Sequence, residues 1–216
     1  ALGENNEDVF VGPNWVSGYQ TIFRVGQPLA SFWGYERLGF YTEEDKAAGL
    51  IPGGKVVGSA KRSDEKKILG KGMPDWTGSF INNFSYKNLD LTVDFQFVYG
   101  VEVLQQFTHS TEDRFGLTNG EKSILYDAWK PGKTDAKTQA IRNATKDGQD
   151  SELDSRWVSD GSYLRANLIQ FGYTFNPNSL KALSALRIYA GVNNLFIINS
   201  KDFRGYDPEA TSQSGS

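Results

Sequence analysis

The chain has 216 residues, of which 38% are hydrophobic and 13% aromatic, and its formal net charge is -3. The basic residues are dispersed, which excludes the concentrated positive surface of a nucleic-acid-binding protein. The absence of cysteine excludes a disulfide framework, thiol catalysis and cysteine-ligated zinc. Few apolar but many aromatic residues favour β-strands with one apolar and one polar face, which also account for the mean hydropathy of -0.48.

Neither end of the sequence has the features of a complete exported protein. No segment approaches the run of roughly 18 apolar residues that a membrane-spanning helix needs. The first residues lack the basic and apolar regions of a signal peptide, and the last ten contain no strand pattern. We therefore expect the sequence to be a piece of a longer protein.

The first aromatic stretch predicts two extended segments, at residues 19–25 and 29–41. Gly26 and Pro28 lie between them and favour a turn. Residues 42–78 follow, and because they are polar and contain several lysines and glycines, we expect a long loop there.

Residues 79–87 and 90–100 predict a β-hairpin with a tight turn. The apolar face of its second strand consists of Leu91, Val93, Phe95, Phe97 and Tyr99. Asp94 and Gln96 lie on the opposite face, an expensive arrangement in a dry core but an ordinary one if that face lines a watery lumen. A half-exposed sheet of a soluble protein fits the same alternation.

A second strand pair is predicted at residues 163–175 and 185–196, joined by a short connection. Between the two pairs, residues 101–160 are polar and mixed, and we expect a long loop with a helix near residues 120–129. Long and short connections therefore alternate, as in an outer-membrane barrel with long extracellular loops and short periplasmic turns. Four tyrosines near strand ends are candidates for interfacial aromatic girdles: Tyr86, Tyr99, Tyr173 and Tyr189.

Several motifs resemble the C-terminal part of SusC/RagA-family TonB-linked outer-membrane proteins, and they occur in the family's order. They are VGQPLASFWGY at residues 25–35, MPDWTG at 73–78, NNFSYKNLDL at 82–91, RWVSDGSYLR at 156–165, FGYT at 171–174, NNLF at 193–196 and GYDPE at 205–209. Each short motif is weak alone, but the ordered set is specific. The resemblance covers residues 24–209.

The resemblance implies an all-β fold: the C-terminal segment of an antiparallel transmembrane β-barrel of about 22 strands, closed by a plug. The plug and the final strand are expected to lie outside this sequence. The implied activity is TonB-dependent import of oligosaccharides or peptides across the outer membrane of a Gram-negative bacterium. The implied partners are a SusD-like surface lipoprotein, TonB through the N-terminal region, and outer-membrane lipid, but no nucleic acid.

Two features of the sequence depart from the family's pattern. Nothing in it matches the plug or the TonB box, and residues 101–160 follow no family motif. Active transport is therefore implied by the resemblance alone, and the choice between glycan and peptide stays open.

Five residues are candidates for contact with a ligand or partner: Trp33, Trp129, Trp157, Asp160 and Tyr163. Aromatic side chains supply large contact areas at low entropic cost, although packing in a core is the more common fate of a tryptophan. Asp94 and Gln96 are the lumen-facing candidates. We expect no catalytic residue, metal or cofactor, and therefore not an enzyme.

Other readings of single residues are weaker. A Ser-His-Asp catalytic site would have to use His109, the only histidine. It lies in a polar stretch without a nucleophile elbow, which favours a solvated loop histidine instead. The acidic residues 147–154 offer oxygen ligands for calcium, but they do not follow EF-hand spacing, which favours a solvated loop.

Two other classes of protein remain as alternatives. A soluble β-sandwich that binds glycan through loop aromatics would be a stable 24.0 kDa domain that needs no detergent. A glycoside hydrolase would need two convergent carboxyls, for which Asp75 and Asp160 are candidates, and measurable turnover.

Overall fold

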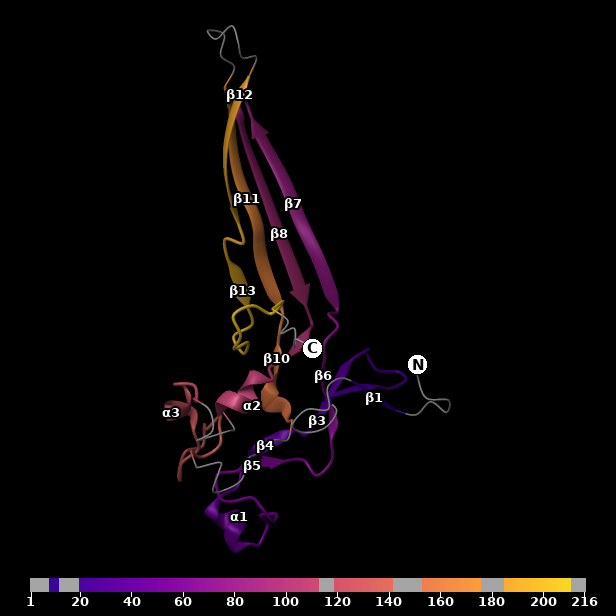
Figure 1. Cartoon of the computed structure of the whole chain (residues 1–216), viewed down its shortest axis with the longest axis vertical. Coiled ribbons are helices and arrows are strands. Elements are labelled where there is room, and N and C mark those ends of the chain that lie inside the picture. The colour runs from indigo at the N-terminus through magenta and orange to yellow at the C-terminus, as the bar shows by residue number, and fades with distance from the viewer. Residues whose placement is uncertain (1–7, 12–19, 113–118, 142–152, 176–184, 211–216) are drawn as a thin grey trace. The chain divides into compact units, whose positions relative to one another are not determined.

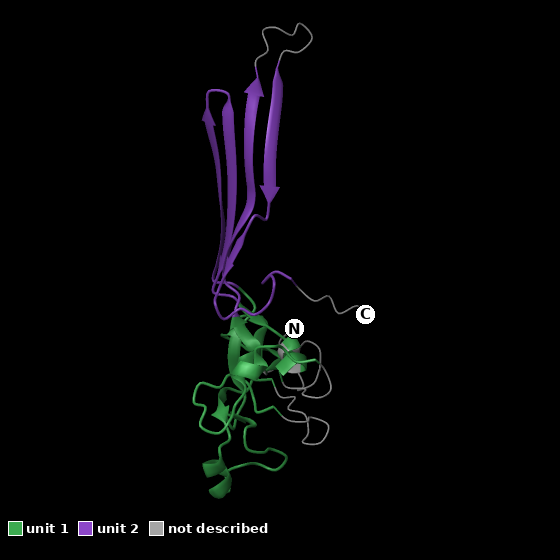
Figure 2. Ribbon diagram, turned by 90° about the vertical axis from the view of Figure 1, so that its left-hand side faces the viewer, with its two compact units in different colours: residues 1–73, 102–159 green, residues 74–101, 160–216 purple. Residues whose placement is uncertain are grey.

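The computed structural model of the chain describes residues 8–11, 20–112, 119–141, 153–175 and 185–210, and most of its regular elements are β-strands. It divides into two units (Figure 2). Unit 1 comprises Ala1–Met73 and Glu102–Ser159, and unit 2 comprises Pro74–Val101 and Asp160–Ser216. None of the helices in the described part of the chain has the length and apolarity to cross a membrane.

Unit 2 is an antiparallel sheet of five strands in the order β12-β11-β8-β7, with β13 paired to β11 (Figure 1). The strands are β7 (Trp76–Tyr86), β8 (Leu89–Tyr99), β11 (Tyr163–Phe175), β12 (Leu186–Asn193) and β13 (Ile197–Asn199). β8 and β11 are central, and β7 and β12 are the edge strands along most of the sheet.

The hairpin β7–β8 begins and ends close to the predicted one, but β7 starts three residues earlier than residue 79. Its turn is made by Lys87 and Asn88, and Lys87 has a φ of +55°. The Asn88 side chain donates to the Thr174 carbonyl at 2.8 Å, and the Thr174 N–H donates to the Asn88 carbonyl at 2.8 Å. The turn is therefore fixed to the neighbouring strand as well as to its own hairpin.

The predicted strand at residues 185–196 is two strands in the structure. β12 ends at Asn193, and Asn194 takes a φ of +51°, which turns the chain before it pairs with β11 again as β13. The break lies beside a β-bulge, at which the register of β11 against β8 shifts between Ala166 and Leu168. The Asn194 N–H donates to the Asn167 carbonyl at 3.0 Å, so the bulge residue and the break stabilise each other.

Unit 1 contains shorter elements. Its strands are β1 (Val9–Val11), β2 (Thr21–Phe23), β3 (Ser31–Gly34), β4 (Arg37–Phe40), β5 (Ala60–Arg62), β6 (Lys67–Lys71), β9 (Glu102–Leu104) and β10 (Val158–Asp160), the last crossing into unit 2. Its helices are α1 (Glu43–Ala47), α2 (Phe107–Glu112), α3 (Ile124–Asp127) and the 3-10 helix η1 (Ser155–Trp157). The sheet order is β1-β2-β3-β6, and β4 pairs with β5 and β9 with β10.

The structure differs from the sequence prediction most in unit 1. The segment 29–41, expected as one strand, is divided into β3 and β4, because Tyr35 leaves the sheet and its N–H donates to the Leu153 carbonyl at 3.0 Å. Residues 42–78, expected as a long loop, contain α1, β5, β6 and the start of β7. Residues 101–160 were expected as a long loop with a helix near 120–129; α3 confirms that helix, and β9, α2, η1 and β10 were not expected. The elements in these segments are held by contacts between residues that are far apart in the chain.

A buried acid joins three of these elements. The Asp154 side chain is fully buried, and its Oδ2 accepts from Arg37 Nε at 2.9 Å and from Arg62 Nε at 2.7 Å. Its Oδ1 accepts from the Arg156 N–H at 2.9 Å. Asp154 therefore connects β4, β5 and the start of η1, and both arginine side chains are themselves less than 10% exposed.

Replacing Asp154 with Asn should lower the free energy of unfolding of the protein by about 3 kcal/mol, because two buried guanidinium groups lose their charge partner. The check is the midpoint of thermal unfolding. The matched control is Glu43→Gln in α1, whose carboxylate is mostly exposed and whose loss should cost less than about 0.5 kcal/mol. Equal shifts for the two variants would contradict the role given to Asp154.

Candidate functional site

The sheet of unit 2 has one face that is almost entirely apolar. Directly opposed residues in antiparallel strands project to the same face, so the strand register assigns each side chain to a face. On β7 and β8 this apolar face consists of Trp76, Gly78, Phe80, Asn82, Phe84 and Tyr86, opposed by Tyr99, Phe97, Phe95, Val93, Leu91 and Leu89. On β11 and β12 it consists of Leu164, Ala166, Ile169, Phe171, Tyr173 and Phe175, and of Val192, Ala190, Ile188 and Leu186.

Many side chains of the apolar face are exposed to solvent in this chain. Trp76 is 70% exposed, Phe80 59% and Ile188 57%. Removing apolar surface from water is favourable by roughly 25 cal/mol per Å², and soluble monomers rarely expose contiguous apolar patches above a few hundred Å². The apolar face therefore requires an apolar environment.

Aromatic side chains with polar groups mark both ends of the apolar face. Trp76 and Tyr99 oppose each other at one end, and Tyr86 and Tyr173 lie on either side of Leu89 at the other. From one end of the 11-residue β7 to the other the distance is about 34 Å at about 3.4 Å per residue. A tilt of about 40° reduces this height to about 26 Å, which agrees with an apolar band about 25 Å tall between the aromatic girdles of a membrane barrel.

The opposite face of the sheet is polar, and its side chains bond to one another across the strands. Thr92 Oγ1 donates to Asn83 Oδ1 at 2.8 Å. Gln96 Nε2 donates to the Tyr163 hydroxyl at 3.3 Å, and Asn167 Nδ2 donates to Gln96 Oε1 at 3.1 Å. The polar face is therefore a connected surface of amides and hydroxyls.

One ion pair of the polar face crosses a strand. Arg187 Nη2 lies 2.5 Å from Asp90 Oδ2, and Arg187 Nε lies 3.2 Å from Asp90 Oδ1. The pair passes over Gly172 of β11, where an added Cβ would lie 2.4 Å from Asp90 Oδ2. Tyr189 is opposite Gly172 with its ring centroid 5.5 Å from the Arg187 guanidinium, so it belongs to the polar face and its assignment to a girdle is wrong.

A second cluster of charges lies at the β13 end of the polar face. Arg165 Nη2 is 2.7 Å from Asp207 Oδ1 and 2.9 Å from Glu209 Oε2, and the Tyr163 hydroxyl donates to Glu209. The Arg165 guanidinium lies 5.4 Å from the Tyr163 ring centroid. Burial opposes ionisation of Asp207, but hydrogen bonds from Arg165 and the Glu209 N–H outweigh it and hold the pKa of Asp207 below its ordinary value.

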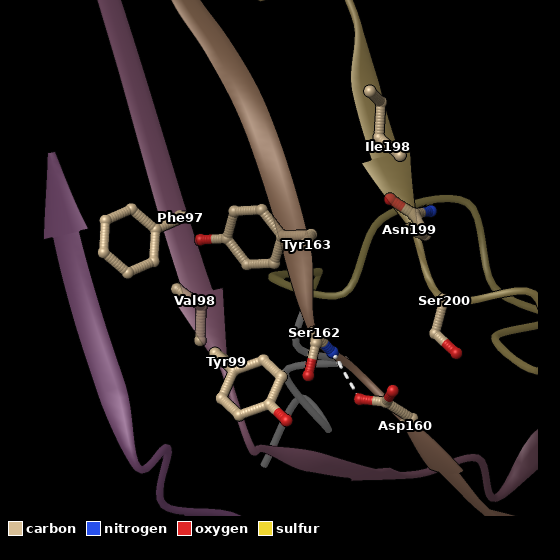
Figure 3. A pocket seen from close by; sticks show the side chains of 9 residues that line it. All are labelled: Phe97, Val98, Tyr99, Asp160, Ser162, Tyr163, Ile198, Asn199 and Ser200. Carbon is tan, nitrogen blue, oxygen red and sulfur yellow. Dashed lines mark hydrogen bonds between the residues drawn. The ribbon is translucent and has the colours of Figure 1, made fainter. Parts of the chain in front are cut away.

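A shallow pocket of about 320 Å³ lies where β8, β11 and β13 meet residues 160–162 (Figure 3). Its lining includes the rings of Phe97, Tyr99 and Tyr163, the aliphatic side chains of Val98 and Ile198, and the carboxylate of Asp160. Burial opposes ionisation of Asp160, but the backbone N–H and hydroxyl of Ser162 and the hydroxyl of Ser200 hold its pKa below the ordinary value. The pocket therefore offers an ionised acceptor beside aromatic rings.

The structure brings together two of the five predicted contact residues. Asp160 and Tyr163 line this pocket, whereas the three tryptophans belong to unit 1 and do not line it. Trp157 is fully buried in unit 1, which argues against direct contact with a ligand. Trp33 stacks under the Arg24 guanidinium at 5.0 Å, and Trp129 lies close against Gly58, so both have partners within the chain.

Asp94 and Gln96 lie on the polar face, Asp94 opposite Ile81 on one side and Leu168 on the other. Asp94 Oδ1 is shielded from solvent without a hydrogen-bond partner among the residues that the structure describes. Gln96, by contrast, bonds to Tyr163 and Asn167, which makes it part of the wall itself.

Sequence reasoning did not single out Arg165, Asp207 or Glu209. All three lie within the motifs RWVSDGSYLR and GYDPE, and alternation from Tyr163 places Arg165 on the same face. The sequence shows an arginine on a strand and two acids two residues apart. It gives no sign that they pair, because Arg165 and Asp207 are 42 residues apart.

Metal ligands do not gather in the part of the chain that the structure describes: no three His, Cys, Asp or Glu side chains there are placed to share an ion. Most of the acidic stretch 147–154 lies outside the described residues, as does the His109 side chain. His109 itself belongs to α2.

The sequence is similar to receptors from Formosa agariphila, although no family model matches it. It is 31% identical to TonB-dependent receptor P3 over 95% of the chain and 21% of the receptor. It is 26% identical to TonB-dependent receptor P39 over 81% of the chain and 17% of the receptor, and 29% identical to TonB-dependent receptor P26 over 87% of the chain and 20% of the receptor. The chain thus spans about a fifth of the length of these relatives.

Solved structures share the fold. The RagAB peptide importer in its 'open-open' state matches with a TM-score of 0.68 and 24% identity, over 98% of this chain and 22% of that one. The 'closed-closed' state matches with a TM-score of 0.69 and 23% identity, over 96% of this chain and 23% of that one.

Alternating strands with one apolar and one polar face, together with these matches, define the class: the chain is homologous to TonB-dependent receptors. Within that class, the resemblance to the SusC/RagA family predicted from the sequence motifs is confirmed.

Replacing Gly172 with Ala should destabilise the protein by about 1–2 kcal/mol, because the new Cβ displaces Asp90 from Arg187. The measurement is the temperature at which the folded form is lost on gel electrophoresis without boiling. Gly191→Ala on β12 is the control, since a Cβ there would meet Gln170 at an ordinary 3.4 Å. A loss of the same size at Gly191 would show that the Asp90 contact is not the cause.

Proposed function

We propose that the chain forms part of the barrel wall of a TonB-dependent nutrient importer in the outer membrane of a Gram-negative bacterium. The observation that carries the proposal is the sheet of unit 2, whose apolar face is bounded at both ends by Trp or Tyr side chains and whose other face is polar. Lipid supplies the apolar environment that the apolar face requires, and a water-filled lumen solvates the polar face.

The wall belongs to an antiparallel barrel of about 22 strands that is closed by a plug. In this arrangement the edge strands β7 and β12 pair with further strands, which removes exposed sheet edges that a bilayer does not tolerate. Asp94 and Gln96 face the lumen, and Phe95 faces lipid. The turn at Lys87 and Asn88 lies on the periplasmic side, and unit 1 contributes the extracellular connections.

The importer takes up oligosaccharides or peptides with a SusD-like lipoprotein, and TonB supplies the energy through the N-terminal region. Homology to TonB-dependent receptors supports the energy source, and the shared fold with the RagAB peptide importer supports a two-component assembly. Neither the relatives nor the polar face suggests an enzyme. Asp160 and Tyr163, which line the pocket, stay as candidates for contact with a ligand or partner.

The alternative is a soluble glycan-binding β-sandwich. It requires a second sheet packed on the apolar face, but Phe80, Phe84 and Ile188 of that face are each more than half exposed. The importer therefore accounts better for the surface.

Replacing Phe95 with Arg should block assembly in the outer membrane, because an arginine near the bilayer midplane costs about 2–4 kcal/mol. The control is Thr92→Arg, which places the same side chain on the polar face of the same strand, and Asp94→Asn should also assemble. The measurement is the amount of folded full-length protein in isolated outer membranes. The reverse order of tolerance would overturn the assignment of the two faces.

The native protein extracted from outer membranes with detergent should have an intact mass several times 24.0 kDa, and a lipoprotein should co-purify with it. Mass spectrometry of the purified assembly measures both. Recovery of a detergent-independent 24.0 kDa species would instead support the soluble binding module.

A further inference from the structure

The chain after β13 turns back toward the sheet. Turns close at Ser200, where the Phe203 N–H donates to its carbonyl at 3.2 Å, and at Asp207, where the Ala210 N–H donates at 3.1 Å. Between these turns Tyr206 is fully exposed, whereas Asp207 and Glu209 reach back to β11. We name residues 200–210 the strap.

The strap is attached to the polar face. Arg165 is opposite Gln96, and Tyr163 is opposite Val98, which places both β11 side chains on the face that also carries Asp94. Since Asp207 and Glu209 bind these two side chains, the strap is fixed to the β13 end of that face.

The attachment joins two shielded side chains of β11 to two partly exposed carboxylates of the strap, since the side chains of Asp207 and Glu209 are 35% and 47% exposed. The side chain of Arg165 is 11% exposed, and one of its nitrogens is shared by both carboxylates. Tyr163 is 6% exposed and holds Glu209 through its hydroxyl. Charge-assisted hydrogen bonds to a partly buried guanidinium are about twice as strong as neutral ones. We name the contacts of Arg165 and Tyr163 with Asp207 and Glu209 the latch.

The latch contains two acids for one arginine. Asp207 lies 2.7 Å and Glu209 2.9 Å from the same guanidinium nitrogen, and the Glu209 N–H also donates to Asp207 Oδ1 at 2.9 Å. Either carboxylate alone still neutralises Arg165. Release of the strap therefore requires the loss of both charges.

We propose that the strap is latched over the polar wall and restricts access from the passage to the part of the wall around Val98 and Tyr163. The inference rests on the proposed function, in which the polar face lines the lumen. The strap then narrows the passage on the side of the long connections, and breaking the latch widens it.

The test measures the rate at which single cysteines in the full-length protein react with a membrane-impermeant maleimide added to intact cells. This chain contains no cysteine, so probes are introduced singly after any cysteine elsewhere in the protein is removed. Val98→Cys lies on the polar face opposite Tyr163, and Gln170→Cys lies on the same face opposite Thr92, away from the strap. Asp207→Asn combined with Glu209→Gln releases the latch.

Release of the latch should raise the labelling rate of Val98→Cys about tenfold or more and leave the rate of Gln170→Cys within about twofold. An unchanged rate at Val98→Cys, or an equal rise at both positions, overturns the proposal. A second comparison leaves the latch intact: Tyr206→Cys, at the exposed tip, should react about tenfold faster than Val98→Cys. Equal rates there also overturn it.

Failure of the proposed function has a different signature. If the apolar face lines the lumen and the polar face meets lipid, Gln170→Cys does not react with the aqueous reagent, while Phe171→Cys on the apolar face does. If the protein is a soluble β-sandwich, both variants are recovered without detergent rather than in the outer membrane. If Gln170→Cys reacts, Phe171→Cys does not, and the labelling rate of Val98→Cys is the same with and without the latch, only the strap proposal is wrong.

Discussion

The rest of unit 2 depends on one constraint, the register between β8 and its two neighbours. A slip by one residue would exchange the faces of a strand, because successive side chains alternate. In β11 the alternation itself changes phase: Leu164 and Ala166 are apolar-face residues before the bulge, and Ile169 and Phe171 are apolar-face residues after it. The extra residue, Asn167, therefore keeps both halves of the strand facing the correct side.

The charges of the polar face are arranged by the same register. Asp90 reaches Arg187 across β11 because the residue between them is Gly172, and Arg165 is matched by acids from beyond the sheet. Charges of opposite sign thus compensate within the wall, apart from Asp94, which has apolar neighbours in the register on both sides. The wall offers mainly amide and hydroxyl groups to whatever lies against it.

The sequence predicted the long strands well and the short ones poorly, for a physical reason. β7 and β8 have 11 residues each, and β11 keeps the apolar–polar alternation on either side of its bulge, so pattern alone indicates these strands. β3 and β4 have four residues each, and the break between them depends on Tyr35 meeting the chain near Leu153. Such distant contacts leave no local periodicity.

The candidate site shows the same division. Alternation was sufficient to place Asp94 and Gln96 on the polar face, and the aromatic-rich motif singled out Asp160 and Tyr163, which line the pocket in the structure. It could not show that Trp157 is buried or that Arg165 meets Asp207, since both depend on how separate segments pack. Tyr189 was misassigned because only its position near a strand end was considered, and not the face of the sheet to which it points.

Asp154 also has a consequence for the time order of folding. It follows Arg37 by 117 residues and Arg62 by 92, and the whole β7–β8 hairpin is made between those arginines and their acid. Contacts that close such long loops form slowly, because the entropic cost precedes the gain. Until Asp154 reaches them, β4 and β5 carry two cations without their shared counter-charge, so we expect this part of unit 1 to be completed late in folding.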